Sequence, residues 1–183
     1  MNALREECQQ LCDELIALRR EFHRAPELGL HEYHTAARIE RELDRCGIPH
    51  ERVGETAVVG HLTGNGNGSG LVVLRADIDG LSGVHEATGL PFASQNPDCM
   101  HACGHDGHMA MVLELGRRIR TKQALPHNIL LLFQPAEETT GGARRLCETG
   151  VLERLRVKAV FALHLWPGLS AGMIAGLPGA MMA

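Results

Sequence analysis

The residues best suited to chemistry lie in one short segment, residues 101–108, which reads HACGHDGH. The segment holds three histidines, one cysteine and one aspartate, and thiolate and imidazole are ligands that zinc and similar metals prefer. Cys103 and His105 are separated by one glycine, so both could reach one ion from a tight turn. Asp106 could orient a ligand or cap a following helix. The alternative is a histidine-rich loop without metal, which would leave polar groups that are costly to bury unpaired.

Two adjacent carboxylates, Glu137 and Glu138, follow the apolar run NILLLFQ at residues 128–134. Sites in open α/β sheets form at the carboxyl ends of strands. One carboxylate could therefore bind a metal ion while the other takes a proton from water activated by that ion. Taken alone, such a pair is more often a solvated acidic turn or a helix N-terminus.

Further polar residues also follow apolar runs. His164 lies in AVFALHL (159–165), where it could bind a metal or be a hydrogen-bonded core residue. Asp77 and Asp79 follow LVVLRA (71–76), where a carboxylate could fix the tautomer of a ligand histidine or form a local turn. Four polar clusters at predicted strand ends are explained better by one catalytic site at one edge of the sheet than by four unrelated occurrences. The pattern indicates a metal-dependent hydrolase with Cys, His and Glu ligands.

The elements that must position these groups follow from hydrophobic periodicity. Apolar residues recur every three or four positions from Leu4 to Phe22, which predicts a helix, and Thr35 could cap a second helix that ends at Cys46. Further helices are predicted at residues 107–120 and 142–148. Strands are predicted at residues 56–62, 71–76, 128–134 and 159–165, with a hairpin-like connection, GNGNGSG, between the first two. The last two strands are expected to be buried. Alternating strands and helices predict an α/β layered fold with a largely parallel central sheet.

Composition excludes some classes of protein. The length of 183 residues suits about one domain. A net charge of −4 and 3% aromatic residues give no reason to expect a nucleic acid or an anionic membrane as partner. The first residues lack the apolar core of a signal peptide, and no apolar run is long enough to span a membrane. Six cysteines without a disulfide-like spacing favour reduced thiols and a cytoplasmic location.

Taken together, the motifs resemble the M20 metallopeptidase family, in the amidohydrolase branch that includes hippurate hydrolases, aminoacylases and indole-acetyl-amino-acid hydrolases. The strings that carry the resemblance are FHRAPELGLHEYHTA, LRADIDGL, EATGLPFASQNPDCMHACGHDGHMAM, LLFQPAEETTGGAR and ALHLWPGLSAGMIA. The resemblance implies a three-layer α/β/α zinc-peptidase-like catalytic domain with a mostly parallel mixed sheet. It also implies hydrolysis of the carbon–nitrogen amide bond of N-acyl amino acids, which are small-molecule substrates.

The same resemblance assigns roles to residues. It implies two divalent transition-metal ions, which could be Zn, Mn, Co or Ni. Glu137 would be the general base that activates a water, and Asp79, or less readily Asp77, would orient the site. The implied metal ligands are Cys103, His105, Glu138 and His164. Three other residues fall in the motif but outside this ligand set, namely His101, Asp106 and His108.

The sequence also departs from the family pattern. Residues 77–82 read DIDGLS where members usually read DMDALP, and Leu165 stands where Asn or Val is common. Members continue into a lid and dimerisation domain and then return to supply a final histidine ligand. Residues 1–183 are therefore expected to be the N-terminal part of the catalytic domain, without the lid or the C-terminal part. The full enzyme is expected to be a homodimer or homotetramer through the missing domain.

Two other functions remain open at this stage. The chain could be a truncated, catalytically silent metal-binding fragment of such an enzyme, because one expected ligand is missing. It could also be a thiol enzyme in which Cys103 is the nucleophile, activated by His105 or His108. The thiol hypothesis leaves Glu137 and His164 without a role.

Overall fold

The computed structural model describes residues 12–64, 70–122, 125–139 and 141–176. Its centre is a five-stranded sheet in the order β1-β2-β6-β3-β7. The strands are β1 (His50–Val53), β2 (Ala57–Leu62), β3 (Leu71–Asp77), β6 (Asn128–Gln134) and β7 (Val157–Ala162). A separate two-stranded sheet consists of β4 (Leu81–Ser82) and β5 (Cys99–Met100).

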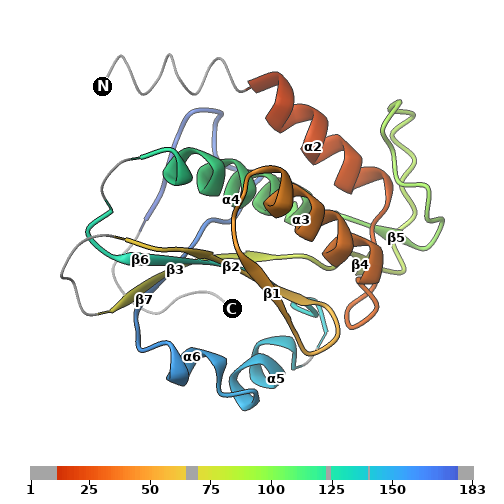
Figure 1. Cartoon of the computed structure of the whole chain (residues 1–183). Helices are drawn as coiled ribbons and strands as arrows, with labels where there is room; N and C mark the ends of the chain where they lie inside the picture. The colour runs from red at the N-terminus through yellow and green to blue at the C-terminus, as the bar shows by residue number, and fades with distance from the viewer. Residues whose placement is uncertain (1–11, 65–69, 123–124, 140, 177–183) are drawn as a thin grey trace.

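Helices cover both faces of the main sheet, which makes three layers (Figure 1). One face carries three helices, α2 (Cys12–Arg24), α3 (Tyr33–Arg45) and α4 (His105–Arg120). The other carries two shorter ones, α5 (Gly142–Glu148) and α6 (Val151–Arg154). The predicted α/β/α architecture is thereby confirmed. None of the helices in the described ranges is long and apolar enough to cross a bilayer.

The sheet is mixed. β3 pairs in parallel with both β6 and β7, whereas β2 pairs antiparallel with both β1 and β6. The carboxyl ends of β3, β6 and β7 therefore lie at one edge, and Asp77 at the end of β3 is the register partner of Gln134 at the end of β6. Polar residues that follow these strands are brought to one place by the pairing alone.

Strand β6 shows why the central strands are apolar at successive positions. Leu131 and Phe133 belong to the core under α3 and α4, whereas Leu130 and Leu132 pack with Leu146 of α5 on the opposite face. Successive side chains of a strand point to opposite faces of the sheet. A strand that helices cover on both faces therefore needs an apolar residue at every covered position, as the run ILLLF at residues 129–133 has.

Two local predictions were wrong. Residues 56–62 and 71–76 do not form a hairpin, because β6 lies between β2 and β3; residues 65–69 of their connection lie outside the described part. Thr35 does not cap its helix, which begins at Tyr33 after Glu32. Instead, the Thr35 main-chain N–H and hydroxyl both donate to the carboxylate of Glu27, which satisfies one of the free amides of the first turn. The predicted helix from residue 4 is described only from Cys12 onward.

The last strand also differs from its prediction as a buried strand. β7 ends at Ala162 rather than at residue 165, and it is an edge strand whose only partner in the described chain is β3. Its side chains are mostly exposed, with Phe161 at 59% and Val160 at 54%. An apolar strand is buried only where further layers cover it. Val157 packs on the apolar cluster below the sheet, but most of β7 is left uncovered by the described residues.

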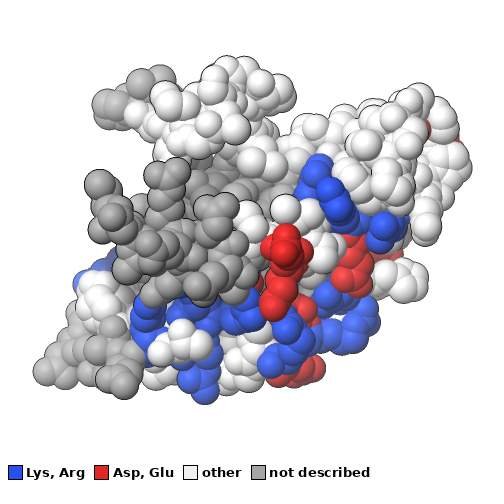
Figure 2. Space-filling model, turned by 90° about the horizontal axis from the view of Figure 1, so that it is seen from above, with Lys and Arg blue, Asp and Glu red and all other residues white. Residues whose placement is uncertain are grey.

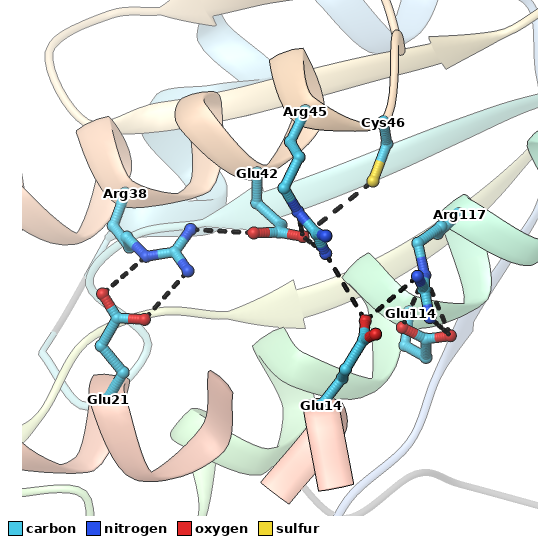
Figure 3. Close-up of polar contacts among 8 residues, drawn as sticks. All are labelled: Glu14, Glu21, Arg38, Glu42, Arg45, Cys46, Glu114 and Arg117. Carbon is cyan, nitrogen blue, oxygen red and sulfur yellow. Dashed lines mark hydrogen bonds and ion pairs between the residues drawn. The ribbon is translucent and has the colours of Figure 1, made fainter. Parts of the chain in front are cut away.

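Charged side chains tie the three helices of the upper layer together (Figure 3). Glu42 on α3 is buried and accepts hydrogen bonds from Arg38 and Arg45 of the same helix. Glu14 on α2 lies 3.8 Å from Arg45 and 3.1 Å from Arg117 of α4. Figure 2 shows this side from above, with basic and acidic side chains lying next to one another over the helices. The three helices therefore share charge contacts as well as an apolar core.

Candidate metal centre

Side chains from two segments converge at the carboxyl edge of the sheet. His105 is the first residue of α4, Cys103 precedes it by two positions, and Glu138 follows β6. One potential ligand atom from each of these three residues lies within 4.8 Å of the others. The structure therefore brings together three of the four residues predicted to bind metal.

The ring of His105 is oriented for a ligand at Nε2. Its Nδ1 lies 2.8 Å from the main-chain carbonyl oxygen of Asp79. Because a carbonyl only accepts, Nδ1 carries the proton and Nε2 is left with a free lone pair. That Nε2 is buried and has no hydrogen-bond partner among the described residues. A buried acceptor without a donor fits a metal ion better than it fits an apolar surrounding.

Three carboxylates face this nitrogen. Oxygens of Asp77, Glu137 and Glu138 lie 3.6, 3.7 and 3.8 Å from His105 Nε2. Burial lowers the pKa of His105, but the carboxylates of Asp79 and Asp77 outweigh burial, so the pKa is raised overall. The centre therefore attracts positive charge, which either a proton or a divalent cation could supply.

The thiol of Cys103 is held protonated in this arrangement. A hydrogen bond to Glu138 and, after it, burial raise the pKa of the Cys103 thiol to about 12. The neighbouring carboxylate disfavours a thiolate as long as no cation lies between the two groups. A thiol, an imidazole and a carboxylate together form a donor set that suits zinc and related transition metals.

Asp79 holds both sides of the centre. Its carbonyl accepts the proton of His105 Nδ1, and its carboxylate Oδ2 accepts the main-chain N–H of Glu138 at 2.8 Å. Burial tends to raise the pKa of Asp79, but hydrogen bonds from His105 and Glu138 lower it overall, so the carboxylate stays charged. The orienting role expected of Asp79 is therefore compatible with its contacts, which reach two candidate ligands.

Asp77 is bonded to residues other than the three candidate ligands. Its Oδ1 lies 2.6 Å from His108 Nδ1, and its Oδ2 accepts from Arg75 at 2.8 Å. Burial works against the charged form, but the hydrogen bond to His108 and the nearby charges of His105 and Arg75 lower the pKa of Asp77 to about 2. His108 Nε2 in turn accepts the main-chain N–H of Leu165 at 2.9 Å. Both ring nitrogens of His108 are thus engaged, although one potential ligand atom from each of Asp77, His105 and His108 lies within 4.8 Å of the others. The place of His108 outside the ligand set stays a prediction.

His164 lies outside the group of converging ligand atoms. Its side chain is exposed, Nδ1 is 2.8 Å from the Leu165 carbonyl oxygen, and its ring centre is 4.8 Å from that of His108. The residue follows the exposed edge strand β7, where the described chain offers few neighbours to fix it. Its role as a ligand stays a prediction.

The remaining residues of the motifs divide by burial. The side chain of Glu137 is 41% exposed, whereas that of Glu138 is 16% exposed. The deeper carboxylate suits a ligand and the outer one can reach water. His101 is buried, and burial lowers its pKa to about 4. Asp106 accepts hydrogen bonds from Arg19 and His23 of α2, so it anchors α4 rather than facing the centre.

Comparison with known proteins identifies the family of this chain. A model described as peptidase family M20/M25/M40 matches residues 73–178. An uncharacterized hydrolase of Staphylococcus epidermidis is 41% identical over 159 residues, which cover 85% of this chain and 41% of that protein. An uncharacterized hydrolase of Staphylococcus aureus is 42% identical over 158 residues. The chain thus spans about two fifths of the length of these relatives.

Solved structures show the same fold. The YXEP protein of Bacillus subtilis, described as a dinuclear metal-binding peptidase of the M20 family, superposes with a TM-score of 0.84 at 38% identity. That match covers 90% of this chain and 46% of the other. An aminobenzoyl-glutamate utilization protein of Klebsiella pneumoniae superposes with a TM-score of 0.69 at 24% identity, which shows a shared fold alone.

Proposed function

The chain belongs to peptidase family M20/M25/M40, and from this premise we propose that it forms the metal-binding part of an amidohydrolase that cleaves N-acyl amino acids. The observation that carries the proposal is the unpartnered, buried Nε2 of His105, which faces the Cys103 thiol and the Glu138 carboxylate. The substrate class follows from the sequence resemblance to the hippurate hydrolase and aminoacylase branch.

Each residue of the centre would have one task in this reaction. Cys103, His105 and Glu138 would hold a divalent ion, with His164 as a further ligand of a two-ion site in the whole protein. When bound, such an ion polarises the amide carbonyl and makes a nearby water more acidic. Glu137 would take a proton from the attacking water and pass it to the leaving nitrogen. Asp79 would keep the ligands and Glu137 in place through its bonds to His105 and Glu138.

The wider setting of this activity is part of the proposal. The substrate would be a small molecule, with neither nucleic acid nor a membrane as partner, and the protein would work in the cytoplasm. The remaining part of the enzyme would supply a lid and the contacts of a homodimer or homotetramer. Support comes from the sequence resemblance and from the fact that the chain spans less than half of its relatives.

The test is hydrolysis of N-acetyl and N-benzoyl amino acids by the purified protein, with and without a strong chelator. Chelation should abolish hydrolysis, and added zinc, manganese, cobalt or nickel should restore it. Glu137→Gln should lower turnover by about 10²- to 10⁴-fold while metal content is unchanged. Glu138→Gln is the matched variant and should lose metal instead. Full activity in excess chelator would refute the metal mechanism.

Two alternatives give different results in the same experiment. A silent metal-binding fragment would bind the ion without turnover, and the place of His164 outside the centre is the observation that favours it. A thiol enzyme would work without metal. Glu138 and burial raise the pKa of Cys103 to about 12, whereas a nucleophilic cysteine needs a lowered pKa, so this alternative is the weaker one.

A further inference from the structure

The turn that carries the two glutamates has an unfavourable backbone conformation. Ala136, directly before Glu137, has φ of 53° and is 2% exposed. This left-handed region is disfavoured for residues with a Cβ atom, so a turn of this kind persists only if its surroundings hold it. A change at Ala136 would redirect Glu137 and Glu138 together, because both follow it in the chain.

One buried side chain from the N-terminal part holds this turn. The Ala136 main-chain N–H donates to Glu32 Oε1 at 2.8 Å. Glu32 is 0% exposed, and its second oxygen, Oε2, has no hydrogen-bond partner within the described ranges. A buried carboxyl group is costly unless its hydrogen bonds repay the loss of water. The bond to Ala136 is one of the interactions that offset this cost, and it is the one that ties Glu32 to the turn.

The segment around Glu32 contacts both loops of the centre. A Cβ atom on Gly29 would lie 3.0 Å from the Cα atom of Ala136, so this segment packs directly on the turn. On its other side, the carbonyl oxygen of Glu27 accepts the N–H of Gly80 at 2.7 Å, one residue after Asp79. The N-terminal motif FHRAPELGLHEYHTA thus lies against the centre, although none of its residues is a candidate ligand.

We propose that Glu32 is a positioning residue, which fixes the Pro135–Glu138 turn through Ala136 and so presents Glu138 to the metal and Glu137 to water. This inference rests on the proposed function, because it assigns Glu32 a purpose through those two residues. It gives the N-terminal motif a task in the metal centre, separate from its packing in the fold.

Three variants separate positioning from general stability. Glu32→Ala removes the acceptor. Glu32→Gln keeps Oε1 as an acceptor at the same reach, and it should behave like the wild type because Oε2 makes no hydrogen bond that the amide group would break. Glu42→Gln is the matched control, since Glu42 is also buried but lies in the helical layer, bonded to Arg38 and Arg45.

Two readouts follow the turn and the centre independently. Hydrogen exchange of the Ala136 amide, measured by NMR on the metal-free chain, reports its bond to Glu32. Binding of cobalt(II), measured by the charge-transfer absorption of its bond to the Cys103 thiolate and by chelator competition, reports the ligand geometry. Glu32→Ala should accelerate exchange at Ala136 and weaken cobalt affinity by about 10- to 100-fold, the usual loss when support of a ligand is removed.

The outcomes test the positioning role of Glu32 and the proposed metal-binding function separately. A folded Glu32→Ala protein with wild-type exchange and wild-type cobalt affinity would overturn the role of Glu32, as would an equal loss in Glu42→Gln. If Glu32→Ala does not fold, Glu32→Asp, which retracts the carboxylate by one methylene, takes its place with the same expectations. If the wild-type chain binds no cobalt, the proposed function fails, and exchange at Ala136 alone then decides whether Glu32 fixes the turn.

Discussion

Binding of a divalent ion should release a proton from Cys103, and this can be measured through pH. The Glu138 carboxylate, followed by burial, raises the pKa of the Cys103 thiol to about 12. That value lies well above neutrality, so at pH 7 the thiol must lose its proton when the ion binds. As long as the pH stays below this pKa, each unit of rising pH should strengthen metal binding about tenfold.

At acid pH, metal binding should release a second proton, from His105. The carboxylates of Asp79 and Asp77 outweigh burial and raise the pKa of His105 above 6.5. Below that raised pKa the ring must also lose a proton before Nε2 can bind, so the slope should approach about a hundredfold per pH unit. Above it, only the Cys103 contribution remains. Cys103→Asp, whose carboxylate is already ionised near neutral pH, should remove that remaining slope.

The assay is zinc affinity by chelator competition across this pH range, together with calorimetry in buffers of different ionisation enthalpy to count released protons. The wild type should release about one proton more per ion than Cys103→Asp. Cys147→Ser, which changes an exposed cysteine on α5, is the control and should keep the wild-type slope. Equal slopes in the wild type and in Cys103→Asp would refute the assignment of Cys103 as a protonated ligand.

Three further predictions concern the fold around the centre. Glu42→Ala should lower the free energy of unfolding by about 1–3 kcal/mol at pH 7. The two arginine bonds outweigh burial and lower the pKa of Glu42. Its contribution to the free energy of unfolding should therefore be complete above the unfolded pKa of 4.5 and fade as the pH falls through the folded pKa. Urea titrations at neutral and acid pH check this. Ile39→Ala, at a site with 0% exposure, should cost about 2–5 kcal/mol in the same urea assay with no change in fold by circular dichroism. Gly142→Ala would place a Cβ atom 1.9 Å from the Pro135 carbonyl oxygen, so it should destabilise the protein by about 1–3 kcal/mol and weaken zinc binding; unchanged zinc affinity would show that the turn tolerates the shift.

Local patterns in the sequence were sufficient for several elements of the fold. The strand at residues 128–134 and the helix at 142–148 have the predicted bounds, because apolar runs and glycines mark their ends. The order of the strands could not be read in the same way. Pairing of β6 with both β2 and β3 depends on contacts between distant segments, which no local period records. The predicted cap at Thr35 failed for a similar reason, because Thr35 lies inside the first turn and donates to Glu27, a residue eight positions earlier in the chain.

In the candidate site, too, local sequence patterns predicted some residues, whereas others depend on contacts between distant segments. The close spacing of Cys103 and His105, and the place of Glu138 after an apolar strand, were enough to predict residues that the structure brings together. Glu32 was not singled out from its motif, because a lone glutamate has no distinctive spacing. Its importance depends on the positive φ of Ala136, which lies 104 positions further along the chain. A non-glycine residue in a turn that needs left-handed backbone gives no signal of its own in a sequence.

The position of β6 between β2 and β3 bears on the order in which the protein can fold during synthesis. Both earlier strands leave the ribosome before their shared partner, residues 128–134, has been made. Until then the backbone N–H and C=O groups along their facing edges have no central strand to pair with, and such long-range pairing is slow to form. Glu138 follows β6 by only four residues. The last central strand and the last of the three converging ligands therefore become available almost together, so metal capture would report that β6 has paired with β2 and β3, before β7 is added.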